Sequence, residues 1–202
     1  MLLPISSLAA MLACAAAGDT SYGRLDGDVA LAASAGAAAS VRGFSGVLDL
    51  RFRYLQTAGI FTTYEESFGA GAEPLRVFTG GIELRPLFLG RFFQDLELGS
   101  PHLDLLMDSL SFDVGAFVAQ PAGGAFADVA GFSFGIGLEL PWLGRASSPF
   151  IGVRAALRWS QEALSAAQPA TVDVLGFSVM LVIGYQGIFG AHVVDQGDLR
   201  TP

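Results

Sequence analysis

The segment Leu48-Asp49-Leu50-Arg51-Phe52-Arg53-Tyr54 alternates throughout between a large apolar side chain and a charged one. In a β-strand, successive side chains point to opposite faces, so one face of this segment is expected to be apolar and the other to carry all three charges. On an α-helix the same charges would be spread around the whole circumference. The pattern therefore predicts a strand.

The same alternation recurs five more times along the chain. It covers about residues 78–85, 110–118, 132–140, 151–159 and 175–185. Two weaker segments complete a set of eight: an Ala-rich one near 27–37 and one near 58–66. A tilted strand needs about 9–11 residues to cross a bilayer, and transmembrane barrels contain an even number of strands. The sequence predicts an all-β fold, an antiparallel up-and-down transmembrane β-barrel of eight strands.

The overall composition is unusual for a water-soluble domain. Hydrophobic residues make up 52% of the 202 residues, and only 15% are charged, against roughly 25% in typical globular domains. The chain contains no lysine, and its formal net charge is −8. We expect no nucleic-acid partner, because no basic patch is available to neutralise phosphates.

The charges on the predicted strands indicate which face meets lipid. Nine charged residues occupy the polar positions, four acids and five arginines that can neutralise one another inside a barrel, as ions removed from water must. They are Asp49, Arg51, Arg53, Glu83, Arg85, Asp113, Glu139, Arg154 and Arg158. The apolar positions carry charge only near strand ends, where charge facing lipid costs least. We therefore expect the apolar face to meet lipid and a salt-bridged interior to fill the barrel.

One rival interpretation comes from the uncharged run at 174–194, which is long enough for a transmembrane helix. Four glycines interrupt it, and Pro169 stands just upstream. A strand with its turn explains the run equally well and extends the pattern seen elsewhere. The helical interpretation stays open as the weaker one.

The connections differ in length between the two predicted ends of the barrel. Longer, external connections are expected near 38–42, 65–74, 120–126 and 161–171, with the acids Glu65, Glu66 and Glu73 in the second of them. Short turns are expected near 56–57 and 143–148. Outer-membrane barrels favour this arrangement, with the short turns on the periplasmic side.

The stretch 87–108 lies on the predicted periplasmic side and has helical spacing. Ser100 before Pro101 is typical of the start of a second helix. The apolar residues that carry the spacing are Phe88, Phe92, Phe93, Leu96, Leu103 and Leu106. Three interpretations stay open: an amphipathic hairpin at the membrane interface, a plug or docking surface for a periplasmic protein partner, and a misread pair of strands.

The two ends of the chain are expected to lie outside the barrel. Residues 1–17 are uncharged and apolar and end in Ala15-Ala16-Ala17, the form of a secretory signal peptide. Cys14, the single cysteine, is alternatively the lipidated residue of a lipoprotein signal. The expected organisation is a signal peptide over 1–17, the barrel over 18–190 and a polar tail over 191–202.

The alternation, the strand number and the signal-like start resemble the eight-stranded outer-membrane barrel class, typified by the membrane domain of outer-membrane protein A. The resemblance covers about residues 27–190 and lies in the pattern, not in a motif. It implies a place in the bacterial outer membrane and insertion by the barrel-assembly machinery. Such barrels usually end on an aromatic residue, whereas here Phe189 is followed by Gly190 and the polar tail.

No catalytic set is visible in the sequence. Barrel enzymes that modify lipids need a positioned base, usually His, and the two histidines, His102 and His192, both lie on the predicted periplasmic side. We expect no metal site and no cofactor. The predicted function is a non-enzymatic, sealed barrel with a structural or interaction role. Alternatives are a small channel or apolar-ligand carrier and, more remotely, a lipid-modifying enzyme.

Overall fold

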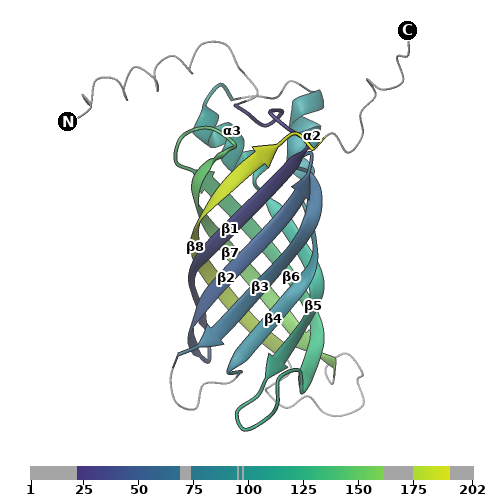
Figure 1. The fold of residues 1–202 in the computed structure, drawn as a ribbon, viewed down its shortest axis with the longest axis vertical. Coiled ribbons are helices and arrows are strands. Elements are labelled where there is room, and N and C mark those ends of the chain that lie inside the picture. The colour runs from purple at the N-terminus through teal and green to yellow at the C-terminus, as the bar shows by residue number, and fades with distance from the viewer. Residues whose placement is uncertain (1–21, 69–73, 95, 97, 162–174, 192–202) are drawn as a thin grey trace, which may run out of the picture.

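The computed structural model describes residues 22–68, 74–94, 96, 98–161 and 175–191. Its eight antiparallel strands follow one another around a closed barrel, as predicted. They are β1 (Val29–Ser40), β2 (Gly43–Tyr54), β3 (Ala58–Ser67), β4 (Arg76–Leu84), β5 (Ser111–Gln120), β6 (Val129–Pro141), β7 (Ser148–Ser160) and β8 (Leu175–Phe189). Figure 1 shows their common tilt around the barrel. The predicted fold class is confirmed.

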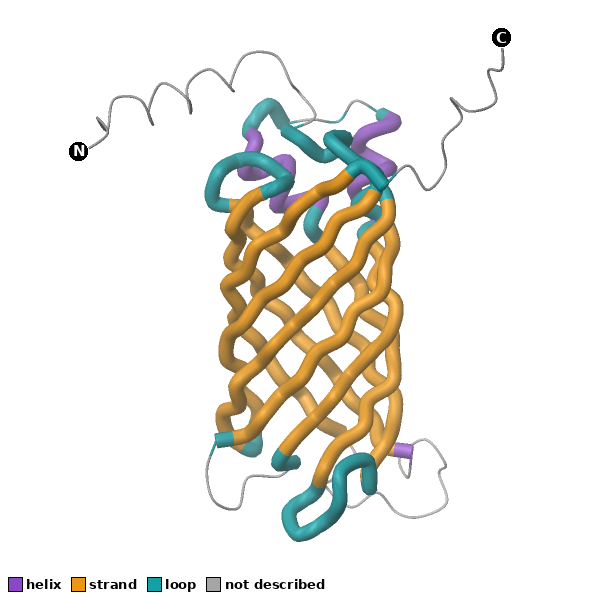
Figure 2. The backbone as a smooth tube through the Cα atoms, viewed as in Figure 1, coloured by secondary structure: helices purple, strands orange, loops and turns teal. Residues whose placement is uncertain are grey.

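Closure is made by the first and last strands. β1 pairs with β8 in an antiparallel register that runs from Val29 opposite Phe189 to Ser40 opposite Ser178. Each strand therefore has a partner on both sides, and the sheet presents no free edge (Figure 2). Closure leaves no row of unpaired backbone groups along a sheet edge.

The two ends of the barrel differ. Two short helices, α2 (Pro86–Phe93) and α3 (Pro101–Asp108), lie over one end, where β1 begins and β8 ends (Figure 1). We call this the capped end and the two helices the cap. The strands β2 and β3 are joined there by Leu55, Gln56 and Thr57. Leu55 and Gln56 have positive φ, and the Thr57 N–H donates to the Tyr54 carbonyl at 3.1 Å, which closes a tight hairpin turn. The connections β1–β2, β3–β4, β5–β6 and β7–β8 lie at the other end, which we call the open end.

The two faces of the sheet differ in chemistry. On β2, Leu48 and Leu50 are each 59% exposed on the outside, while Arg51 between Leu50 and Phe52 is 3% exposed inside. The same alternation between exposed and buried residues extends along β6, where Phe134, Ile136, Leu138 and Leu140 all point outward. The barrel is thus apolar outside and polar inside, the reverse of a water-soluble protein.

The uncharged run near 174–194 contains β8, so the helical interpretation of it is wrong for residues 175–189. Its inward positions include Met180 and Val182, which pack with Phe150 inside the barrel. This inward apolar patch removed the polar alternation that marks the other strands. Among the residues that the structure describes, no helix combines the length and apolarity that a membrane span requires.

Two predicted connections at the open end are shorter than expected. β1 ends at Ser40 and β2 begins at Gly43, so only Val41 and Arg42 lie between them. β3 continues to Ser67, so Glu65 and Glu66 belong to a strand and not to an external connection. Glu65 points into the barrel and is buried. The predicted strand near 58–66 is confirmed, but the prediction of an external connection that begins at residue 65 was wrong for Glu65 and Glu66, because two adjacent acids interrupt the alternation at this strand end.

Candidate functional site

Eight of the nine predicted interior charges meet in one cluster at the middle and capped side of the barrel. We call this cluster the charge belt. Its members come from five strands and from the residue that follows β4. They are Asp49, Arg51 and Arg53 on β2, Glu83 on β4 with Arg85 after it, Asp113 on β5, Glu139 on β6 and Arg154 on β7.

Arg51 connects the carboxylates on one side of the charge belt. Its Nη1 and Nη2 donate to the two carboxylate oxygens of Asp113 at 2.9 and 2.8 Å. Its Nε donates to Asp49 at 2.9 Å, and Nη1 lies 3.2 Å from a Glu83 oxygen. The guanidinium also lies over the Phe61 ring, 5.2 Å from its centroid. One arginine therefore compensates three carboxylates that would be costly to bury alone.

Glu139 connects the arginines on the other side of the charge belt. It accepts hydrogen bonds from Arg53 at 2.8 Å, from Arg85 and from Arg154. Arg53 also donates from Nε to Glu83 at 2.8 Å, which links the two halves of the belt. Seven of the eight ions thus contact more than one partner, and Asp113 is bound by Arg51 at two points, the condition under which charges can be buried at tolerable cost.

The ninth predicted charge, Arg158, lies apart from the belt. It forms a two-point ion pair with Glu65 nearer the open end. Glu65 is the fifth interior acid that the sequence analysis placed outside. With it the interior holds five acids and five arginines, four of each in the belt and one of each in this pair. The barrel interior is therefore electrically balanced.

A second buried ion cluster lies under the cap, and the sequence analysis missed it. Asp108 of α3 pairs with Arg24, which precedes β1, and with Arg91 of α2 at 2.7 Å. Arg91 also donates to Asp104, whose carboxylate accepts the backbone N–H of Leu98 at 2.8 Å. These contacts hold both helices of the cap against the end of the barrel. The separation in sequence between Arg24 and Asp108 left no local signal for the pair.

Burial and hydrogen bonding act in opposite directions on Asp104. Burial alone would raise the pKa of its carboxyl. The Leu98 N–H and the Arg91 guanidinium outweigh that effect and lower the pKa below its ordinary value. Asp104 is therefore held in its charged form as part of the cap.

The six predicted insertion residues do not form one buried face. Phe88 is buried, 3% exposed, whereas Leu96 and Leu103 are more than half exposed and Leu106 is half-buried. The side chains of Phe92 and Phe93 lie outside the described part of the structure. The face of α3 turned to the barrel carries Asp104, Leu105 and Asp108 instead. The apolar spacing was a poor guide here because the buried acids are compensated by distant arginines.

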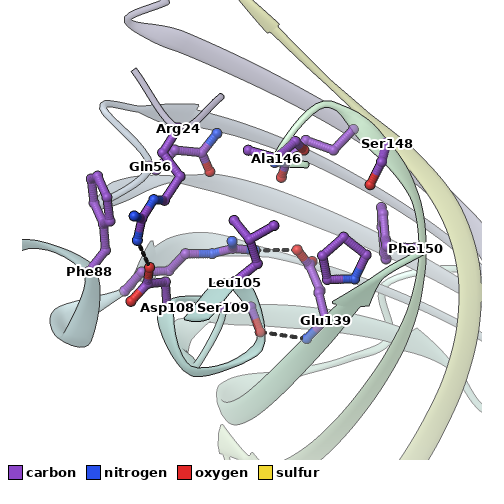
Figure 3. A pocket seen from close by; sticks show the side chains of 13 residues that line it. Arg24, Gln56, Phe88, Leu105, Asp108, Ser109, Glu139, Ala146, Ser148 and Phe150 are labelled. Atoms are coloured by element: carbon purple, nitrogen blue, oxygen red, sulfur yellow. Dashed lines mark hydrogen bonds and ion pairs between the residues drawn. The ribbon is translucent and has the colours of Figure 1, made fainter. Parts of the chain in front are cut away.

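A small cavity of about 40 Å³ remains between the cap and the charge belt. Figure 3 shows Leu105 and Phe88 from the cap on one side of it and Phe150 and Ser148 from β7 on the other. Its volume suffices for a water molecule. The Nε2 atom of Gln56, which lines the cavity, is buried without a protein partner, so a water bound here would satisfy it.

A second small cavity, of about 20 Å³, lies on the open side of the charge belt. Arg51, Asp113 and Arg154 are among the residues that line it. The Nε and Nη1 atoms of Arg154 and the hydroxyl of Thr79, also in the lining, are buried without protein partners. The belt side chains therefore lie between two cavities that are each only large enough for one or two waters.

The open end holds a cavity of about 300 Å³, larger than the two beside the charge belt, which we call the vestibule. Its apolar lining includes Val77, Phe117 and Val129, and its polar lining is mainly serine. The ion pair of Glu65 with Arg158 lies at its inner end. The vestibule is the part of the barrel with the size of a small-molecule site.

Candidates for catalysis and modification are few. His102 of α3 lies within 3.2 Å of the Trp142 carbonyl oxygen through Nε2. The part of the chain that the structure describes contains no group of three side chains able to hold a metal ion. His192, Cys14 and the predicted signal peptide over 1–17 lie outside the described residues, so those predictions stay predictions.

Comparison with known proteins shows a likeness of fold but no relative in sequence. No protein-family model matches the chain, and no curated protein does either. Among solved structures, the chain is similar to the crystal structure of Neisserial surface protein A, with 13% sequence identity and a TM-score of 0.39. The similarity covers 80% of this chain and 96% of that chain.

Proposed function

We propose that the chain is an integral β-barrel of the bacterial outer membrane with a sealed, salt-bridged interior and a structural or interaction role. The observation that supports this most strongly is the inverted arrangement of its two faces. Large apolar side chains on all eight strands point outward, and ten charged side chains lie inside. Such an outer surface would be poorly soluble in water but suits the hydrocarbon core of a bilayer.

Aromatic residues at both ends of the barrel support the same placement. Tyr54, Trp142 and Tyr185 lie toward the capped end, and Tyr64 and Trp159 lie toward the open end. Outer-membrane barrels carry aromatic girdles at both interfaces. With the short turns and the cap on the periplasmic side, the open end faces outward, and insertion is assigned to the barrel-assembly machinery.

The charge belt supports the proposal of a sealed interior. Eight paired ions fill the barrel between two cavities of about 40 and 20 Å³. An eight-stranded barrel leaves an interior only wide enough for side chains. Passage of a hydrated ion would require several of these ion pairs to separate together, so the barrel is assigned no pore function.

Two measurements test this proposal. A folded barrel should migrate differently from its heat-denatured form on a detergent gel, and planar bilayers containing it should show no reproducible conductance steps. Loss of the gel shift would contradict the membrane barrel. Regular conductance steps would contradict the sealed interior and favour the small-channel alternative, with Arg51, Arg154 and Arg158 lining the path.

The vestibule favours a second candidate, a carrier of apolar ligands. Buried apolar side chains line it at the open end, where a sealed structural barrel has no need of them. Saturable uptake of an apolar molecule by the folded barrel would support this role. The cap surface with Leu96, Leu103 and Met107 exposed stays a candidate contact for a periplasmic protein partner.

A further inference from the structure

The apolar part of the vestibule is one continuous surface formed by adjacent strands. Val77 on β4 lies opposite Ala119 on β5, and Ala119 lies opposite Val129 on β6. Phe117 lies one inward position deeper on β5, and it packs with Val77 and Ala119 in one cluster. We call these four residues the apolar wall. Val77, Phe117 and Ala119 are each less than 10% exposed.

The strands across the barrel contribute hydroxyl groups at the same height. Ser40 on β1 lies opposite Ser178 on β8, and Ser45 on β2 lies opposite Ser67 on β3. All four line the vestibule, and we call them the hydroxyl wall. β8, β1 and β2 lie across the barrel from β4, β5 and β6 in the closed order of strands, so the apolar wall faces hydroxyl groups. Within the hydroxyl wall, Ser40 and Ser67 donate to the carbonyl oxygens of Gly43 and Pro74, whereas the buried Ser178 hydroxyl has no partner in the described part of the structure.

The inner end of the vestibule carries charge that is already compensated. Both terminal nitrogens of Arg158 donate to Glu65, so the pair is neutral as a unit. A charged ligand group that reached this depth would lose its water without gaining an opposite charge. Arg42, the other charged residue of the described lining, is exposed at the rim. The lining therefore suits an uncharged group.

We propose that the vestibule binds one uncharged amphiphile, with a short apolar chain or ring against the apolar wall and a hydroxyl or carbonyl oxygen toward the hydroxyl wall. The inference rests on the proposed membrane barrel and names the ligand class for its carrier role. The volume of about 300 Å³ lies at the lower end of the range for small-molecule sites, so the ligand is small, smaller than a membrane phospholipid.

Photo-crosslinking distinguishes binding of the probe in the vestibule from its partitioning into the bilayer. The full-length barrel is refolded into phosphatidylcholine vesicles and irradiated with an octanol that carries a diazirine in its chain. Mass spectrometry then compares Val77, which faces the vestibule, with Phe78, which faces outward on the same strand. Excess 1-octanol should reduce labelling at Val77 and Phe117 at least fivefold and leave labelling at Phe78 unchanged.

A matched pair of variants tests the location. Ala119→Trp fills the space beside the apolar wall and should abolish the saturable labelling. Ala116→Trp adds the same side chain on the outer face of the same strand and should leave it intact. The gel shift of both variants checks that they fold, so loss of labelling in Ala119→Trp is not mistaken for misfolding.

Other labelling patterns would contradict the binding site, the membrane barrel or the uncharged ligand. Labelling at Phe78 without saturable labelling at Val77 or Phe117 would overturn the binding site and leave the membrane barrel standing. Absence of labelling at Phe78 as well would contradict the membrane barrel itself. If the octanoate analogue labels Val77 as strongly as the alcohol does, the assignment to an uncharged ligand is wrong.

Discussion

Arg51 on β2 and Asp113 on β5 are 62 residues apart in sequence and form a two-point ion pair inside the barrel, at 2.9 and 2.8 Å. The side chain of Asp113 is 9% exposed and that of Arg51 is 1% exposed. β2 and β5 are not neighbours in the sheet, so this pair crosses the barrel interior. It is one of the contacts by which the charge belt ties opposite walls together.

The pair predicts energetic coupling between its two residues. Arg51→Met should cost about 3–5 kcal/mol of unfolding free energy, because it leaves buried carboxylates without compensation. Arg51→Met combined with Asp113→Leu should cost less than the sum of the single changes by at least about 1 kcal/mol. Denaturant unfolding from vesicles measures both values.

A control pair comes from the same two strands. Leu50→Ala and Val114→Ala alter outward neighbours of Arg51 and Asp113, and their effects should add within about 0.5 kcal/mol because the side chains lie on the outer surface. Additive behaviour of Arg51 and Asp113 as well would mean that the buried pair is not coupled, against the geometry described here.

Substitutions at Arg154 and Val153, adjacent residues of β7, should differ in their effect on stability. Arg154 is buried and pairs with Glu139, whereas Val153 is 50% exposed on the outside. Arg154→Leu should destabilise the barrel by about 3–5 kcal/mol because it strands buried charge, and Val153→Leu should change its stability by less than about 0.5 kcal/mol. Equal effects would reverse the assignment of inside and outside.

The contribution of Asp104 to the stability of the cap should depend on pH. Its pKa is lower in the folded protein than its ordinary value of 3.8, so it stabilises the cap above that value and loses this contribution as the pH falls through the folded pKa. Asp104→Asn should therefore weaken the cap at pH 7 by about 1.5–3 kcal/mol, the range for a charge-assisted hydrogen bond.

Hydrogen exchange of the α3 amides, compared between the natural protein and Asp104→Asn, measures this contribution. The difference between the two proteins should be constant from pH 7 to about 5 and shrink in acid as Asp104 becomes protonated. Because Asp108 shares Arg91 with Asp104, the same comparison is repeated in an Asp108→Asn background, where Asp108 no longer titrates. A difference that grows in acid would contradict the lowered pKa.

The sequence predicted the barrel well because period-2 alternation is a local property. Leu48 to Tyr54 and four of the other strands show it without reference to the rest of the chain. The number of strands and the polarity of each face follow from it. β8 was ambiguous because Met180 and Val182 face an apolar part of the interior, and local pattern cannot distinguish that from a buried helix.

The parts that sequence reasoning missed depend on contacts between distant residues. Glu65 was assigned to an external connection, because its burial depends on the ion pair with Arg158, which lies 93 residues away in sequence. The buried face of α3 was misjudged for the same reason, since Arg24 and Arg91 make it favourable to bury Asp104 and Asp108. The vestibule needs the register of the strands, which no local pattern gives.

The central claim is that this barrel faces lipid with its apolar side and seals its polar side within. Two single-tryptophan proteins, made in a Trp142→Phe, Trp159→Phe background, test it most directly in vesicles of lipid brominated on the acyl chains. Phe134→Trp places the indole on the outer face, where Phe134 is 36% exposed, and Phe117→Trp places it inside, where Phe117 is 7% exposed. Strong quenching of the first and weak quenching of the second is predicted. Equal quenching, or stronger quenching of the second, would contradict the account.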